Sequence, residues 1–173
     1  MRFIWEDEFL GLQGLIRAQR AKIYKKFKRH VSVNDLLSDR WDTAEFCGFG
    51  EGSSCYNNVL ILGDVRVGKN TWIGPNVVLD GTAGLEIGDF CSISAGVQIY
   101  THNTVNWSNS LGVAAPETAP TKIGNGVYIG PNSIVQMGVA IGDSSVIGAM
   151  SFVNHDVKSN DRVFGCPARS SDG

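Results

Sequence analysis

Histidine and cysteine are the side chains of this sequence best suited to act as bases, nucleophiles or metal ligands. The three histidines are His30, His102 and His155. Imidazole titrates near neutral pH, so a suitably placed histidine could take a proton from an attacking amine or hydroxyl. The spacing alone leaves a second interpretation open, in which His102 is an ordinary surface residue in a turn.

The cysteines are spaced too irregularly for a zinc site or a dense disulfide framework. Cys47, Cys55, Cys91 and Cys166 are separated by 8, 36 and 75 positions, with no C-x-x-C pair. Cys55 and Cys91 fall on positions of the repeat described next, which predicts that they fill small spaces in the core. A nucleophilic cysteine would need a nearby base, and the sequence indicates none.

The elements that would position these side chains are short units of six residues. Each unit can form one strand and one tight turn, and three units form a coil of 18 residues that stacks on the next coil. Residues 49–104 and 123–158 give about five such coils, with two residues inserted around Gly81–Gly84. The apolar anchors of the units are expected to point inward: Cys55, Ile61, Val67, Ile73, Leu79, Ile87, Ile93, Ile99, Ile123, Ile129, Val135, Ile141, Ile147 and Val153.

The segment before the repeats is predicted to be helical. Residues 5–29 place Phe9, Leu12, Ile16, Ile23 and Phe27 near one helical face. Ser32 and Asp35 resemble a capping box that opens a second helix over residues 33–46. The first coil would otherwise expose strand edges, so we expect apolar residues of this segment to cover it: Leu36, Leu37, Trp41 and Phe46.

Charge is distributed unevenly along the chain, although the net charge is only −2. Residues 1–30 carry eight Lys or Arg and three Asp or Glu, whereas residues 31–173 carry seven and fourteen. The basic start fits a solvated helix face, and it also leaves open a membrane surface or a nucleic acid as partner. No aromatic–basic stripe or zinc pattern favours nucleic acid. With no signal peptide and no long apolar run, we expect a cytoplasmic protein without a membrane span.

Residues 103–122 interrupt the repeats and are expected to form an extended loop. They contain Pro116 and Pro120 among small polar residues. Val105 and Ile123 are 18 positions apart, so a degenerate coil with Glu117 pointing inward stays an alternative. A long loop in a tight repeat is more often functional than idle.

The runs VRVGKNTWIGPNVVL and IGNGVYIGPNSIVQMGVAIGDSSVIGAMSFV resemble the hexapeptide-repeat acetyltransferases. This resemblance implies an all-β fold, a left-handed parallel β-helix of about five coils over residues 47–170, preceded by a helical segment over residues 1–46. It also implies acetyl-CoA as co-substrate, no metal, and a homotrimer whose active sites lie between subunits.

The sequence SISAGVQIYTH, a Trp-containing loop and PTKIGNGVYIGPNS resemble most the sugar-nucleotide N-acetyltransferases of the perosamine type. That resemblance implies acetylation of a nucleotide-linked amino sugar, such as GDP-perosamine or a dTDP-amino-deoxyhexose, for surface polysaccharides such as O-antigen. His102 would be the general base in a direct transfer. An O-acetyltransferase acting on a sugar or polysaccharide is the main alternative.

Other site residues are assigned from their positions relative to the same motifs. Asp80, Asn103 and Trp107 are expected near the acceptor, although Asn103 replaces the acidic residue expected there. Two alternatives stay open, since Asp80 beside the insertion could be a turn carboxylate and Trp107 could anchor the loop instead of stacking on a sugar or base. The resemblance places coenzyme A along Tyr128, Gly130, Gly148, Ala149, Asn154, His155 and Arg169, the last in the closing GCPAR motif.

Two further functions compete with acetyl transfer. A γ-type carbonic anhydrase shares the repeat but needs three imidazoles on zinc, and two of the three histidines lie outside the regular coils. A non-catalytic scaffold would leave His102 and the long loop without a role.

Overall fold

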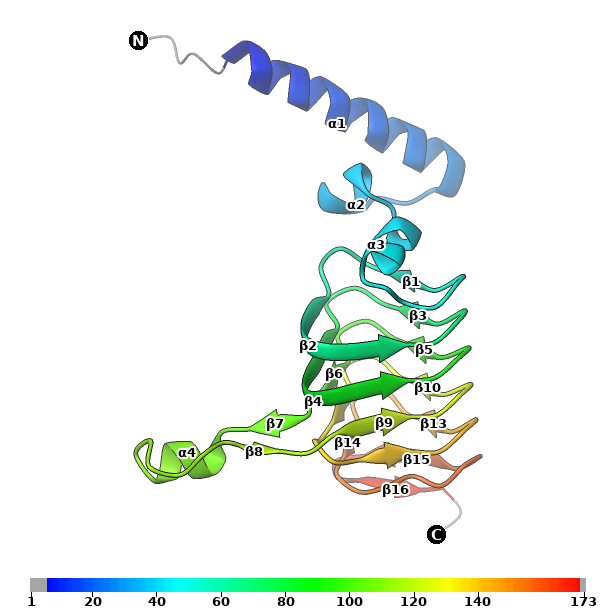
Figure 1. Ribbon diagram of the computed structural model, residues 1–173. Coiled ribbons are helices and arrows are strands. Elements are labelled where there is room, and N and C mark those ends of the chain that lie inside the picture. Colours follow the sequence, from blue (N-terminus) through cyan, green and yellow to red (C-terminus); the bar gives the residue numbers. More distant parts are fainter. Residues whose placement is uncertain (1–5, 172–173) are drawn as a thin grey trace. The chain divides into compact units, whose positions relative to one another are not determined.

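The chain divides into a helical unit, residues 1–39, and a β-helical unit, residues 40–173 (Figure 1). The computed structural model describes residues 6–171, and in the first helix it describes side chains from Leu10 onward. The sequence placed the boundary after residue 46; in the structure the last short helix belongs to the β-helical unit.

The helical unit contains α1, Glu6–Phe27, and α2, Asn34–Leu37. The Ser32 hydroxyl donates to the Asp35 carboxylate at 2.6 Å, so the two residues of the expected capping motif do contact each other. The single helix predicted over residues 33–46 is wrong, because the backbone is extended at Ser38 and a new helix, α3, begins at Arg40 and ends at Phe46. No helix in the described part of the chain is long and apolar enough to cross a membrane.

Parallel strands of the β-helical unit stack coil upon coil (Figure 1). One sheet contains, in spatial order, β1 (Ser54–Cys55), β3 (Trp72–Ile73), β5 (Ser92–Ile93), β10 (Tyr128–Ile129), β13 (Val146–Ile147), β15 (Arg162–Gly165) and β16 (Ala168–Ser170). The other contains β12 (Ala140–Ile141), β9 (Thr121–Ile123), β4 (Val78–Ile87), β6 (Gln98–Ile99), β11 (Ile134–Val135) and β14 (Phe152–Val153), with β2 (Leu60–Val67) paired to β4.

The anchors pair with one another from coil to coil, as the period of six predicted. Ile73 pairs with Ile93, and Ile93 pairs with Ile129 across the position of the long loop. The turns between strands hold one residue in the left-handed region, for example Asn76 and Asn132, each with φ of 58°. Asparagine tolerates that conformation better than most side chains, which explains the repeated Gly-Pro-Asn turns.

The core is the column of inward anchors. All predicted anchors are buried except Ile61, which is partly buried, and Cys55 and Cys91 lie in the core as expected. Polar residues on the second inward position are satisfied by neighbouring coils: the hydroxyls of Ser133 and Thr71 donate to the carbonyls of Gly148 and Gly88, both at 2.8 Å. Buried hydroxyls with such partners avoid the cost of unpaired polar groups.

Of the four apolar residues expected to cover the first coil, Leu36 is buried, but the prediction is wrong for Leu37, Trp41 and Phe46. All three are exposed, and Phe46 is 92% exposed. The core is instead extended at this end by Ala44 of α3 and by Phe49, which are buried. The small Ala44 side chain lets α3 approach the first coil closely, which a larger residue at that position would prevent.

Candidate active site

A hairpin-like excursion leaves the β-helix at one corner, after β6. It consists of β7 (His102–Asn103), α4 (Val105–Asn109) and β8 (Glu117–Thr118) (Figure 1). The two strands pair antiparallel, with His102 opposite Thr118. The Ala119 amide donates to the Thr101 carbonyl at 2.9 Å and closes the excursion at its base. His102 is therefore fixed where a regular coil meets the excursion.

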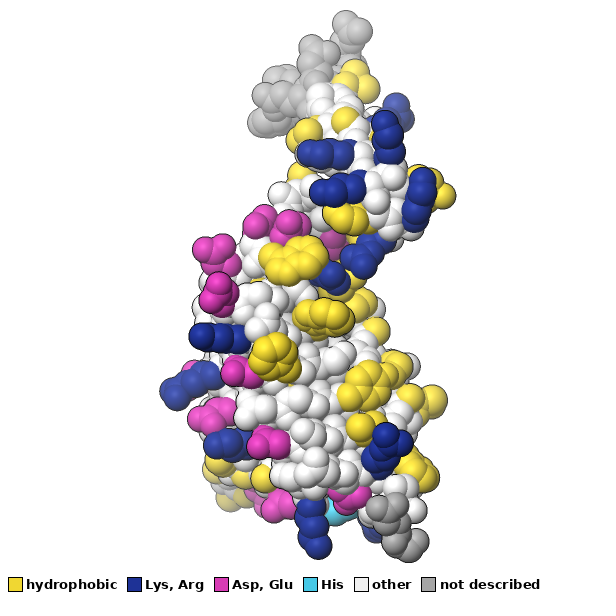
Figure 2. Space-filling view, turned by 90° about the vertical axis from the view of Figure 1, so that its right-hand side faces the viewer, with side chains coloured by type: hydrophobic (Ala, Val, Ile, Leu, Met, Phe, Trp, Pro, Cys, Tyr) yellow, Lys and Arg dark blue, Asp and Glu magenta, His cyan; other side chains and the backbone are white. Residues whose placement is uncertain are grey.

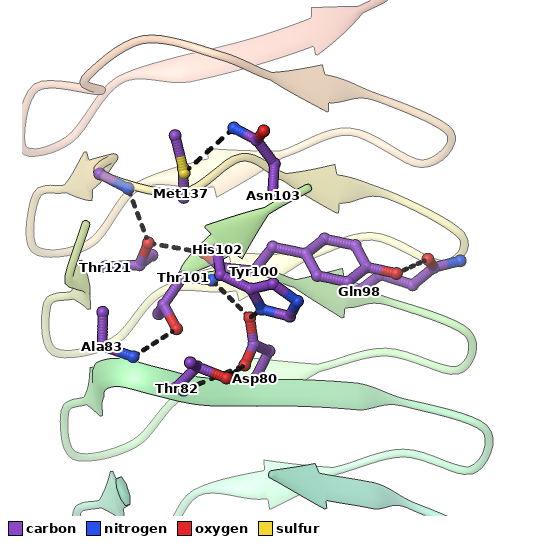
Figure 3. Close-up of polar contacts among 11 residues, drawn as sticks. Asp80, Thr82, Ala83, Gln98, Tyr100, Thr101, His102, Asn103, Thr121 and Met137 are labelled. Carbon is purple, nitrogen blue, oxygen red and sulfur yellow. Dashed lines mark hydrogen bonds and ion pairs between the residues drawn. The ribbon is translucent and has the colours of Figure 1, made fainter. Parts of the chain in front are cut away.

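The imidazole of His102 contacts a buried carboxylate. Its Nδ1 lies 2.5 Å from Oδ2 of Asp80, and Figure 3 shows the ring directed toward that carboxylate. The side chain of His102 is 31% exposed, whereas that of Asp80 is fully buried. One edge of the imidazole is thus held by the protein while the ring retains access to solvent.

Asp80 is surrounded by hydrogen-bond donors. Its Oδ1 accepts from the Thr82 hydroxyl at 2.5 Å and from the Thr82 amide at 3.0 Å, and its Oδ2 accepts from the Thr101 amide at 2.9 Å (Figure 3). Burial alone would raise the pKa of the Asp80 carboxyl. The hydrogen bonds from Thr82, Thr101 and His102 outweigh burial and hold this pKa well below its usual range.

An ionised Asp80 determines the tautomer of His102. A carboxylate can only accept hydrogen bonds, so Nδ1 of His102 must carry the proton between them. In the neutral ring, Nε2 is then unprotonated and can accept a proton from another molecule. The pair has the arrangement of a general base held in one orientation by an acidic partner.

The structure corrects the role expected for Asp80. The sequence suggested a residue that contacts the acceptor, but a fully buried carboxylate occupied by four donors is not available for that contact. The sequence contained a signal for the contact between Asp80 and His102. Leu79 pairs with Ile99, a step of 20 that includes the two-residue insertion, so Asp80 lies beside the residues just before His102, one coil earlier in the stack.

The remaining residues expected near the acceptor lie in the excursion. The amide of Asn103 donates to Glu117 at 2.9 Å, and that of Asn106 donates to the other oxygen of the same carboxylate. Glu117 is exposed and does not occupy an inward anchor. Trp107 lies on α4 and is about half exposed. The contacts of Asn103 and Asn106 with Glu117 therefore hold the excursion together, and the excursion presents the Trp107 ring to solvent.

Four of the expected coenzyme A residues lie together on successive coils. Tyr128 on β10 pairs with Val146 on β13, and the two strands lead into Gly130 and Gly148–Ala149. A Cβ added to Gly130 would lie 2.5 Å from the Ala149 amide nitrogen, so the two turns are in direct contact and only glycine fits.

The other expected coenzyme A residues lie elsewhere. Asn154 and His155 follow β14, which is two strands from β6 in the same sheet, so they occupy the corner of His102 further along the stack. Nδ1 of His155 lies 3.1 Å from the Asn154 side chain. Arg169 lies on β16, which folds back antiparallel on β15. A single copy of the chain thus divides the expected residues between two corners and its far end.

Among residues 6–171, no three His, Cys, Asp or Glu side chains gather in a group that could hold a metal ion. The three imidazoles that a γ-type carbonic anhydrase would need are therefore not assembled in the described chain.

Two family models match the coils. The bacterial transferase hexapeptide model, of six repeats, matches residues 120–155, and the hexapeptide repeat of succinyl-transferase matches residues 64–101. Galactoside O-acetyltransferase of Escherichia coli K12 is 30% identical over 123 residues, which are 60% of this chain and 61% of the relative. The chain thus spans about three fifths of the length of that curated relative.

Solved structures agree with this relationship. The hexapeptide-repeat acetyltransferase VCA0836 of Vibrio cholerae, in complex with acetyl coenzyme A, is 26% identical with a TM-score of 0.68; the match covers 93% of this chain and 87% of that one. The N-acyltransferase AntD of Bacillus cereus shares the fold, with 24% identity, a TM-score of 0.65 and 70% of each chain covered. The chain therefore carries hexapeptide repeats over residues 64–101 and 120–155, and its left-handed β-helix is similar to that of hexapeptide-repeat acetyltransferases.

Proposed function

We propose that this protein transfers the acetyl group of acetyl-CoA to an amine or hydroxyl acceptor, with His102 as the general base and Asp80 as its orienting partner. The observation that carries the proposal is the contact between Nδ1 of His102 and the buried, ionised Asp80. A scaffold would not need a solvent-accessible imidazole paired to a carboxylate that has three other donors.

The reaction proceeds by direct transfer. Nε2 of His102 takes a proton from the acceptor as its nitrogen or oxygen attacks the thioester carbonyl carbon. The carbon–sulfur bond then breaks, and the departing sulfur takes up the proton from the imidazolium. Asp80 stabilises the positive charge that builds on the ring between these two steps.

The expected coenzyme A residues support an active site shared between copies of the chain. Gly130, Gly148 and Ala149 form a glycine track in which Gly130 is buried and Gly148 and Ala149 reach the surface, and this track lies at a different corner from His102. The exposed backbone of the track suits a long flexible ligand. A homotrimer would bring the His102 corner of one copy to the glycine track of another.

The acceptor is proposed to be a nucleotide-linked amino sugar used in cytoplasmic synthesis of surface polysaccharide. The proposal rests on the sequence around His102 and on Trp107, whose half-exposed ring could stack on a sugar or base. A sugar O-acetyltransferase is the second candidate, and the 30% identity to a galactoside O-acetyltransferase favours it.

A thiol-release assay with acetyl-CoA tests the proposal. The acceptors would be GDP-perosamine, dTDP-amino-deoxyhexoses, their unlinked sugars and galactosides. Turnover on a nucleotide amino sugar at low KM supports the first candidate, and turnover on hydroxyl acceptors alone supports the second. Absence of both turnover and acetyl-CoA binding would overturn the assignment.

A further inference from the structure

The helical unit carries a run of positive charge that the acetyltransferase assignment does not use. Between Glu8 and Asp35 there are seven Lys or Arg residues and no Asp or Glu. All seven are exposed: Arg17, Arg20, Lys22, Lys25, Lys26, Lys28 and Arg29. Figure 2 shows Lys and Arg side chains crowding this unit, whereas both signs of charge are mixed over the coils.

Large apolar side chains are exposed on the same helix. Leu10, Leu12, Leu15, Tyr24 and Phe27 are all exposed, from about half for Leu12 at 47% to 62% for Leu10. The Lys26 ammonium lies 4.8 Å from the centroid of the Phe27 ring, so a cation and an aromatic ring are presented together. Exposed leucines and aromatic rings beside lysines are typical of helices that lie at the interface between lipid and water.

We propose that α1 binds the surface of a membrane rich in anionic phospholipid and lies along it without crossing. Lysines and arginines would contact the phosphate groups, and Leu12, Leu15 and Phe27, which helical spacing places on one side of α1, would enter the acyl boundary. A nucleic acid would match the charge but would leave the exposed leucines without a partner, so the apolar side chains favour lipid.

The rest of the chain restricts this contact to the helix. Residues 31–173 carry seven basic and fourteen acidic side chains, a net charge of −7, so an anionic surface repels them on average. Attraction to the membrane thus comes from residues 9–30, and the inference holds whether or not the proposed acetyl transfer is correct.

Vesicle flotation with the full chain tests the proposal. Vesicles of phosphatidylcholine with phosphatidylglycerol should bind the protein, and vesicles of phosphatidylcholine alone should not. Each basic residue near an anionic surface contributes a factor of about 5 in affinity, so the triple variant K22Q/K25Q/K26Q should bind about 100-fold more weakly. Raising the salt to about 1 M should release the protein, because the screening length falls to about 3 Å.

A control variant removes the same number of positive charges from the coils. R66Q/K69Q/K158Q also removes three exposed positive charges and should keep the affinity of the unchanged protein. L12S/L15S tests the apolar contribution and should weaken binding without altering its salt dependence. Circular dichroism would verify that each variant keeps its helix and coils.

Three outcomes would overturn the proposal. These are equal binding to neutral and anionic vesicles, equal loss in the two charge variants, and tighter binding to duplex DNA than to anionic vesicles at the same salt.

Discussion

Replacing Asp80 by asparagine tests the proposed mechanism most directly. The amide has nearly the shape of the carboxylate, but it offers one acceptor oxygen where the aspartate offers two. Oδ1 of Asp80 accepts two donors from Thr82, so the amide NH2 should face His102 and the Thr101 amide. An NH2 group that donates to Nδ1 would move the ring proton to Nε2, where it blocks the base.

Two losses add up in this variant. A hydrogen bond to a charged group contributes about 1.5–3 kcal/mol, so losing it where the imidazolium forms should lower kcat roughly 10- to 150-fold. The wrong tautomer adds to this, and the analogous change in a Ser-His-Asp triad lowers kcat about 10⁴-fold. We therefore expect D80N to lose between about 10²- and 10⁴-fold in kcat, with little change in the KM for acetyl-CoA.

The assay is thiol release under saturating acetyl-CoA and acceptor, accompanied by a thermal melt. D64N is a matched control, because Asp64 is exposed at the same corner of the preceding coil and pairs only with the exposed Arg66 among the described contacts. D64N should keep its activity. If folded D80N worked within about 3-fold of the unchanged enzyme, the role assigned to Asp80 would be refuted.

Four further predictions follow from the same contacts. H102A should lower kcat about 10²–10⁴-fold in thiol release while acetyl-CoA binding by calorimetry persists; unchanged turnover would remove His102 as the base. G130A should cost about 1–3 kcal/mol in denaturant unfolding, because the new methyl meets backbone at 2.5 Å, whereas G14A on α1, with open space around it, should be neutral or stabilising. The lowered pKa of Asp80 stabilises the fold above its unfolded value near 3.9, and this contribution is lost as pH falls toward the folded value, so acid unfolding of D80N should depend less on pH below about pH 4. E117A should raise the acceptor KM several-fold with kcat nearly kept, because the excursion loses two amide contacts; an unchanged KM would separate the excursion from acceptor binding.

The coils could be predicted because their pattern is local and repeated. Each anchor from Ile73 to Val153 repeats one requirement, an apolar side chain pointing inward every six residues, and the errors of single units average out. The surroundings of Asp80 could not be predicted with the same ease. They depend on how a two-residue insertion shifts one corner against the next, and only a register of 20 between Leu79 and Ile99 reveals it.

The helical segment shows the opposite limit. Its apolar residues were expected to be buried because they are apolar. Leu36 is buried, yet Leu37, Trp41 and Phe46 are exposed and the small Ala44 enters the core. Hydrophobicity indicates what a residue could bury, while the fit of α3 against the first coil decides which residue is buried.

The excursion after β6 begins and ends at neighbouring positions. The Ala119 amide donates a hydrogen bond to the Thr101 carbonyl, and His102 pairs with Thr118. None of its residues from 103 to 118 enters the core, and His102 stays on the side of the coil. The segment can therefore be exchanged independently of the coils. A different sequence that keeps the Thr101–Ala119 and His102–Thr118 pairs could be grafted there. Acceptor preference could then change between relatives, or by design, while the proposed pair of His102 and Asp80 and the stack of coils remain as they are.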